Sequence, residues 1–245
     1  MTKRKAVIVA ILALAAAIVA GSVAMARART TAELLRADPD HLTAALAKVG
    51  HDRGGGIFAA HCAACHGADA KGDRGAGIPD LTDRDFLYGQ GRASEIEQIV
   101  LHGIRARDSK GWNLASMPAY ARARPYRTEE IRPLEPQAIR DLASFLVART
   151  HASADRAAVA RGLALYSGRG GCWDCHGTDA KGDSAIGAPD LTDRVWLYGD
   201  GSAPAIARSI GEGRAGVCPA FAHRISAGDA RAVAIYTASL AGRRT

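Results

Sequence analysis

Cys62-Ala63-Ala64-Cys65-His66 and Cys172-Trp173-Asp174-Cys175-His176 are two copies of one pentapeptide pattern, 110 residues apart in a chain of 245. Cys-x-x-Cys-His is the attachment motif of c-type haem. Each cysteine thiol adds across one vinyl group of the porphyrin to form a thioether, and the adjacent histidine binds the iron. The two motifs therefore predict two covalently bound haem c groups, with His66 and His176 as iron ligands. Two haems in turn predict electron transfer.

Cys-x-x-Cys pairs also occur in zinc sites and in thioredoxin-like redox centres. A structural zinc site needs a second pair of Cys or His ligands, and the first repeat contains no further cysteine. A thioredoxin-like pair requires a strand–helix context, which is absent around both motifs. Haem attachment is therefore the interpretation that both motifs favour.

Composition limits the other function classes. Four of the five cysteines belong to the motifs, so Cys218 is left over and no disulfide framework is available. The formal net charge of +7 comes mainly from arginine, without the interleaving of basic and aromatic residues that would favour a nucleic-acid partner. Aromatic residues make up only 5% of the chain, so we expect a porphyrin to fill much of each core.

The N-terminus carries Lys3, Arg4 and Lys5 ahead of an apolar run over residues 6–20, which continues weakly to residue 26. Basic residues before an apolar segment keep that end in the cytoplasm and send the rest outward. Ala24-Met25-Ala26 fits a signal-peptide cleavage site, yet residues 6–26 are also just long enough to cross a bilayer. A cleaved signal and a retained anchor both stay open, and either one predicts periplasmic haem domains.

An internal duplication fills most of the chain. The offset of 110 residues holds from the motifs through 79–89 and 189–199, and Gly103 still matches Gly213. Residues 117–120 then match 218–221 at an offset of 101, so the first repeat carries about nine extra residues around 108–113. A second extra loop, 122–136, is rich in Arg, Pro and Glu.

Apolar residues at helical spacing predict a closing helix in each repeat, at 137–149 and 229–241. A short helix leads into each motif, at 56–62 and 157–167, and no strand-like alternation appears between the helices. We therefore predict an all-α fold with a few helices around each haem. The predicted segments are a signal peptide or membrane anchor at 1–26, a polar helical lead-in at 27–51, domain 1 at 52–150, a boundary at 150–154, and domain 2 at 155–245.

Several segments beyond the motifs carry a family resemblance. The second repeat reads Gly187-Ala-Pro-Asp-Leu-Thr-Asp-Arg-Val-Trp-Leu-Tyr-Gly199, and the first contains Ser116-Met117-Pro118-Ala119. These residues resemble the class I cytochrome c fold, and more closely the dihaem subunit (subunit III) of cbb3-type cytochrome c oxidases, over roughly residues 52–245. The resemblance implies two tandem class I cytochrome c domains.

The resemblance also implies roles for single residues. Pro79 and Pro189 would each supply the carbonyl that accepts the other N–H of a proximal histidine, which fixes the tautomer; a rigid turn before a helix is the alternative. Four residues are candidates to pair with haem propionates, since a fixed guanidinium suits a carboxylate. They are Arg84, Arg194, Tyr88 and Tyr198. The alternative is that they are ordinary surface charges and core-packing residues. Trp112 and Trp196 are interpreted as packing residues.

The sixth iron ligands differ between the repeats. Met117 stands where the family places its distal methionine, so we expect it to ligate the first haem, where a thioether raises the potential. The matching residue of the second repeat is Cys218. Cys218 could ligate the second haem as a thiolate and lower its potential, His223 could replace it, or the iron could stay five-coordinate or water-bound. Axial ligands move haem potentials over about 0.8 V, so this one position would separate the two haems.

Two classes of function follow. The first is an electron relay in a respiratory chain, exchanging electrons with a quinol-oxidising complex, a small cytochrome c or a terminal oxidase. The second is an enzyme in which the cysteine-ligated haem is catalytic, as in thiosulfate dehydrogenases. The surrounding residues match the oxidase subunits, and no acid–base constellation stands out near Cys218 beyond His223 and Arg214. We therefore predict a relay without catalytic residues; a periplasmic dihaem shuttle that serves no oxidase is a further alternative.

Overall fold

The computed structural model describes residues 3–126, 129–151 and 155–242. Helices and one short antiparallel hairpin, in which Arg124 pairs with Ile131, are the regular elements of the described residues, and long loops connect them. This hairpin falls in the extra loop 122–136, whose residues 127–128 lie outside the described ranges, as do residues 152–154 of the predicted boundary. The elements are α1 (Lys3–Arg36), α2 (Ala44–His61), α3 (Ala63–His66), α4 (Ala93–His102), β1 (Arg124–Tyr126), β2 (Glu129–Ile131), α5 (Pro136–Thr150), α6 (Arg156–Ser167), α7 (Trp173–His176), α8 (Ala203–Glu212) and α9 (Ala227–Leu240).

Helix starts follow the local sequence. Thr43, Asp155, Ser202 and Ser226 each accept a hydrogen bond from a backbone N–H in the first turn of the helix that follows. Such side chains satisfy donors that a helix N-terminus leaves unpaired. The predicted all-α fold is confirmed, and the closing helices predicted at 137–149 and 229–241 are α5 and α9.

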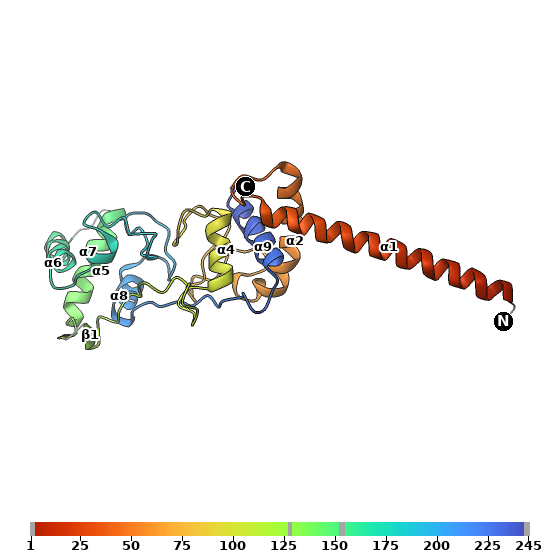
Figure 1. Ribbon diagram of the computed structural model, residues 1–245. Coiled ribbons are helices and arrows are strands. Elements are labelled where there is room, and N and C mark those ends of the chain that lie inside the picture. Colours follow the sequence, from red (N-terminus) through yellow and green to blue (C-terminus); the bar gives the residue numbers. More distant parts are fainter. Residues whose placement is uncertain (1–2, 127–128, 152–154, 243–245) are drawn as a thin grey trace.

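The helices form two lobes (Figure 1). In the lobe that carries Cys62, α9 packs against α2 and α4, and in the lobe that carries Cys172, α5 packs against α6 and α8. We call them the first lobe and the second lobe. Each lobe therefore combines the haem motif of one repeat with the closing helix of the other repeat. The sequence ranges 52–150 and 155–245 do not coincide with these spatial units, because the chain crosses between lobes after α4 and again after α8.

Apolar surfaces explain where each closing helix docks. On α5, Leu142 and Leu146 belong to a buried cluster with Tyr166 and Ile206 from the second repeat. On α9, Val233 belongs to a buried cluster around Phe58 and Ala70, and Ile235 packs with Leu34. Each lobe thus has an apolar core built from both repeats.

Glycines permit the close helix crossings. A Cβ atom on Gly54 of α2 would collide with the backbone of Ala232 in α9, and one on Gly162 of α6 would collide with the backbone of Asp141 in α5. Both crossings join opposite repeats. The two lobes therefore use the same device to seat a helix from the other half of the chain.

Helix α1 leaves the first lobe as a long extension (Figure 1). At about 1.5 Å per residue its 34 residues extend roughly 51 Å. Within the described residues, Val7–Arg36 is the one helical stretch long and apolar enough to cross a membrane. The predicted lead-in at 27–51 is divided between the end of α1 and the start of α2.

The inner end of α1 is fixed to the first lobe by polar contacts. Arg231 of α9 donates to the carbonyls of Leu34 and Ala37 at 2.9 Å each and pairs with Glu97 of α4 at 2.5 Å. Leu34 itself is fully buried. The helix that could cross a membrane is therefore continuous with the core of the first lobe.

Candidate haem sites

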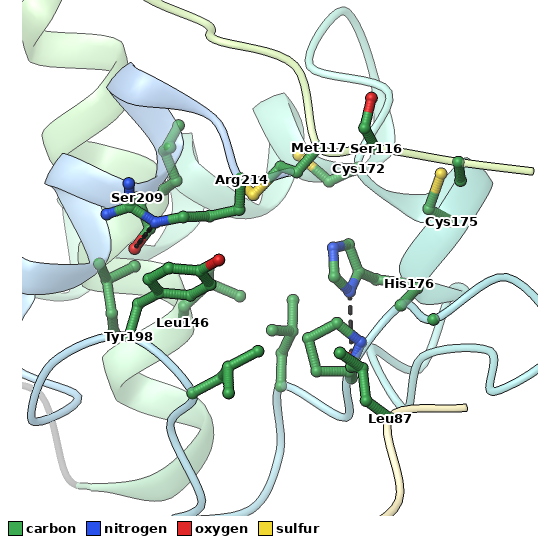
Figure 2. A pocket seen from close by; sticks show the side chains of 18 of the residues that line it. Leu87, Ser116, Met117, Leu146, Cys172, Cys175, His176, Tyr198, Ser209 and Arg214 are labelled. Atoms are coloured by element: carbon green, nitrogen blue, oxygen red, sulfur yellow. Dashed lines mark hydrogen bonds between the residues drawn. The ribbon is translucent and has the colours of Figure 1, made fainter. Parts of the chain in front are cut away.

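The second lobe contains a pocket with mostly apolar walls. Cys172, Cys175 and His176 line it, together with Met117 and Arg214. Figure 2 shows these side chains around one space, with Arg214 and Tyr198 across the view from Cys175. Apolar lining from several elements completes the walls: Leu87, Leu142, Leu146, Ile186, Leu191, Val195 and Ile206. The pocket therefore joins both predicted kinds of iron ligand, imidazole and thioether, to the attachment cysteines of one motif.

Both proximal histidines are oriented by a proline carbonyl. Nδ1 of His176 lies 3.1 Å from the Pro189 oxygen, and Nδ1 of His66 lies 3.3 Å from the Pro79 oxygen. The hydrogen bonds expected of Pro79 and Pro189 are therefore present. Burial lowers the pKa of both imidazoles, so each ring is neutral at pH 7. With Nδ1 donating to a carbonyl, Nε2 keeps the lone pair that a metal requires.

Met117 lies in the second lobe although it belongs to the first repeat. Its backbone forms an antiparallel bridge with Arg214, with N–H···O distances of 2.9 Å in both directions. This bridge continues as Tyr120 donates to Ile210 and Ala121 donates to Gly211. The segment after Ser116 is therefore held along the C-terminal end of α8, which places Met117 in the pocket of Cys172 and His176.

Cys218 lies in the first lobe although it belongs to the second repeat. Its carbonyl accepts from Ile104 at 2.9 Å and its N–H donates to Ile104 at 3.1 Å, while Phe221 donates to Val100. Burial, together with the nearby thiols of Cys62 and Cys65, raises the pKa of the Cys218 thiol to about 11. The thiol therefore stands beside the attachment cysteines of the first motif.

The two distal segments are thus exchanged reciprocally. The sequence favours Met117 for the haem of Cys62 and Cys218 for the haem of Cys172, and the structure places them the other way round. Each distal segment has two equivalent helix ends with which it could pair, because the C-terminal ends of α4 and α8 match at the 110-residue offset. In the structure, each helix end pairs with the segment from the opposite repeat. Repeat alignment alone cannot distinguish these two pairings.

The remaining predicted residues divide between the pocket and the surface. Tyr198 lines the second-lobe pocket, and Trp196 packs against its core. Tyr88 is buried and accepts a hydrogen bond from Arg105. The predicted propionate partners Arg84 and Arg194 are exposed and do not line this pocket, and His223, an alternative ligand, is also exposed.

Two arginines at the pocket are absent from the sequence-based set of propionate partners. Arg105 lines the second-lobe pocket from the first repeat, and the guanidinium of Arg214 lies 4.5 Å from the ring centre of Tyr198. The place of Arg105 could not be read from the sequence, because it lies at the haem motif of the opposite repeat. The cysteine, histidine and methionine side chains, the apolar walls and these cations fit a covalently bound haem.

Two family profiles match this chain, one in each repeat. The Cytochrome c family profile matches residues 51–150, and the profile for subunit III of cbb3-type cytochrome c oxidase matches residues 157–236. Subunit FixP of the cbb3-type cytochrome c oxidase from Bradyrhizobium is 36% identical over 88% of this chain and 68% of its own length. The chain belongs to the CcoP/FixP family. Members of this family carry two haem c groups, in agreement with the two sites.

Other CcoP/FixP proteins match to a similar extent. The Rhodobacter capsulatus subunit CcoP is 37% identical over 85% of this chain and 66% of its own length. The FixP subunit of Rhizobium etli is 34% identical over 88% and 68%. The chain therefore spans about two thirds of these relatives. The matches favour the oxidase relay over the thiosulfate-dehydrogenase-like enzyme.

A solved structure from Kuenenia stuttgartiensis, its reducing HAO-like protein complex Kustc0457/Kustc0458, also matches. It is 17% identical and covers 77% of this chain and 96% of its own, with a TM-score of 0.20. That TM-score is too low to indicate a shared arrangement. The CcoP/FixP assignment therefore rests on the sequence relatives.

Proposed function

We propose that this chain is the dihaem electron-relay subunit of a cbb3-type oxidase, which takes electrons from a redox protein outside the membrane and passes them to the oxidase. Each haem would supply one-electron exchange at its iron. The observation that carries the proposal is the reciprocal exchange of distal segments, which ties both haem sites into one body. Two haem sites joined by shared backbone segments suit transfer from one redox partner to another.

The ligand sets assign each residue to a site. In the second lobe, Cys172 and Cys175 would attach the haem, and His176 and Met117 would bind its iron. In the first lobe, Cys62 and Cys65 would attach the haem, and His66 and Cys218 would bind its iron. A thioether favours ferrous iron, whereas an anionic thiolate favours ferric iron, so the second lobe carries the haem of higher potential.

The N-terminal helix serves as a retained membrane anchor. A cleavage after Ala26 would cut inside the continuous helix α1, whose last turn is docked on the first lobe through Leu34. The positive charges of Lys3, Arg4 and Lys5 would remain in the cytoplasm, which places both lobes in the periplasm. The first lobe then lies next to the membrane and the second lobe farther away (Figure 1).

Purification of the full chain from solubilised membranes of its own cells tests this function. We expect two haem c groups per chain, an intact α1 and a co-purifying oxidase that reduces oxygen. A double Cys172→Ala/Cys175→Ala variant is expected to stop electron delivery to the oxidase while the subunit still associates. Recovery of a soluble dihaem protein without an oxidase, or turnover of thiosulfate that disappears in Cys218→Ala, would contradict the proposal.

A further inference from the structure

Arg105 is a residue of the first repeat whose side chain serves the site of the second. It lines the pocket that contains Cys172, His176 and Met117. Its φ of 49° is left-handed, which is unfavourable for a residue with a Cβ atom. Backbone pairing fixes this conformation, because the Arg105 N–H donates to the Trp112 carbonyl at 3.1 Å. A strained backbone position that the surrounding structure holds in place points to a specific task for its side chain.

The guanidinium of Arg105 is held by neutral acceptors. Nε donates to the Gly216 carbonyl at 2.6 Å, and Nη1 donates to the Tyr88 hydroxyl at 2.6 Å and the Ala115 carbonyl at 3.0 Å. Among the described residues no carboxylate forms an ion pair with Arg105, whereas Arg53, Arg161 and Arg231 each have one. Nη2 has no recorded acceptor in the described part of the chain. The charge of Arg105 is therefore positioned but not neutralised by the protein.

The partners of Arg105 place it between the two walls of the pocket. Tyr88 packs over Gly187, which lies two residues before Pro189, the acceptor for the proximal histidine. Ala115 lies two residues before Met117 on the distal wall. Arg105 would therefore be available to hold a polar group of a haem bound by His176 and Met117. The anionic groups of a haem are the two propionates on its edge, and a fork of guanidinium N–H donors suits a carboxylate.

Neither of the two arginines at the second-lobe pocket has an arginine at the matching position of the other repeat. At the offset of 110 residues Arg105 corresponds to Ala215, and Arg214 corresponds to Ile104. Both arginines near the distal segment therefore belong to the second-lobe site. A nearby positive charge disfavours the extra positive charge of ferric iron, so it raises the potential in the same direction as a methionine ligand.

We propose that Arg105, held by Tyr88, binds a propionate of the haem in the second lobe and raises the potential of that haem relative to the first. The inference rests on the proposed function only for the presence of haem at the site. Arg105 and Tyr88 both belong to the first repeat, so the first half of the chain tunes the potential of the haem attached to the second half.

Redox titration of the purified holoprotein tests this role. Arg105→Gln removes the charge, and Arg107→Gln is the matched control, because Arg107 is exposed on the same loop. The haem of the second lobe is recognised by the absorption and EPR features that Met117→Ala abolishes. At a fixed applied potential, we expect Arg105→Gln to raise the ratio of oxidised to reduced iron at that haem about tenfold, equivalent to about 59 mV for one electron.

Controls separate the charge from a structural role. We expect Arg105→Lys, which keeps the charge, to shift that ratio less than about threefold. Tyr88→Phe removes one of the three hydrogen bonds that hold the guanidinium, and we expect it to shift the ratio by an intermediate factor. Arg107→Gln and the first-lobe haem should change by less than about twofold. An unchanged ratio in Arg105→Gln, equal shifts at both haems, or equal shifts for the Lys and Gln variants would overturn the inference. None of these outcomes depends on association with an oxidase, so failure of the proposed function would be recognised separately.

Discussion

Met117 and Arg214 face each other across an antiparallel bridge in which each N–H donates to the other's carbonyl at 2.9 Å. Ile104 and Cys218 form the equivalent bridge in the other lobe. In each bridge, the residue just after a helix of one repeat pairs with the distal segment of the other repeat. The candidate distal ligand of each repeat therefore lies beside the haem motif of the other repeat.

Replacement of Cys218 by methionine should make the two haem sites alike. A thioether in place of a thiolate stabilises ferrous iron, so we expect the first-lobe haem to rise in potential by a large part of the about 0.8 V range that axial ligands span. Potentiometric titration should resolve two well-separated waves in the natural protein and closer waves in Cys218→Met. If the second-lobe haem moves instead, the exchange of distal segments is refuted.

Substitution of Gly54 by alanine should destabilise the first lobe. Its Cβ would meet the Ala232 backbone, and such overpacking costs about 1–3 kcal/mol. Gly56→Ala is the matched control on the same helix α2, because a Cβ there meets nothing within 4 Å. We expect that control to stabilise the helix by up to about 1 kcal/mol. Thermal unfolding followed by circular dichroism gives both values, and similar losses for the two variants would show that α9 does not dock on α2.

Removal of Arg231 should loosen the junction between α1 and the first lobe. Arg231 and Glu97 form an ion pair in which both side chains are almost fully covered, so Arg231→Met leaves an unpaired carboxylate at a cost of about 3–5 kcal/mol. We expect a lower midpoint of denaturant unfolding and faster proteolysis after Ala37. The double variant Arg231→Met/Glu97→Leu should recover most of the loss. If it is no more stable than the single variant, the carbonyl contacts of Arg231 dominate instead.

Carboxylates gather where the two repeats meet, and they predict a pH dependence. Partial burial, together with Asp193, Asp83 and Asp190, raises the pKa of Asp85 to about 6. The folded state therefore binds a proton more tightly than the unfolded state, and stability falls as the pH rises from about 4 through 6. Because the carboxylate is partly exposed to solvent, we expect less than about 1 kcal/mol.

Asp85→Asn should consequently stabilise the protein at pH 7.5 and have almost no effect at pH 3.5, where the natural side chain is protonated in both states. Denaturant unfolding at the two pH values measures the difference. Asp69→Asn is a suitable control, since Asp69 is exposed near the first motif. A destabilising Asp85→Asn substitution at pH 7.5 would show that the charge of Asp85 is satisfied in the folded state.

Local chemistry was readable without the structure because it depends on neighbouring residues. Cys-x-x-Cys-His defines its own attachment geometry, and the family resemblance implied the carbonyl acceptors Pro79 and Pro189, which the structure shows beside the two histidines. The closing helices and their apolar faces were also predictable, because helical periodicity lies within a single segment. Membership of the CcoP/FixP family agrees with these local patterns.

The pairing of ligands was decided only by the tertiary structure. Met117 and Cys218 occupy matching positions, and each could dock beside α4 or α8, whose C-terminal ends are also equivalent. Repeat alignment therefore does not distinguish the two pairings, and the choice depends on contacts between segments about 100 residues apart. The sequence by itself determined which residues can bind and attach two haems; the packing of α5 on α6 and of α9 on α2 determined which haem each of them reaches.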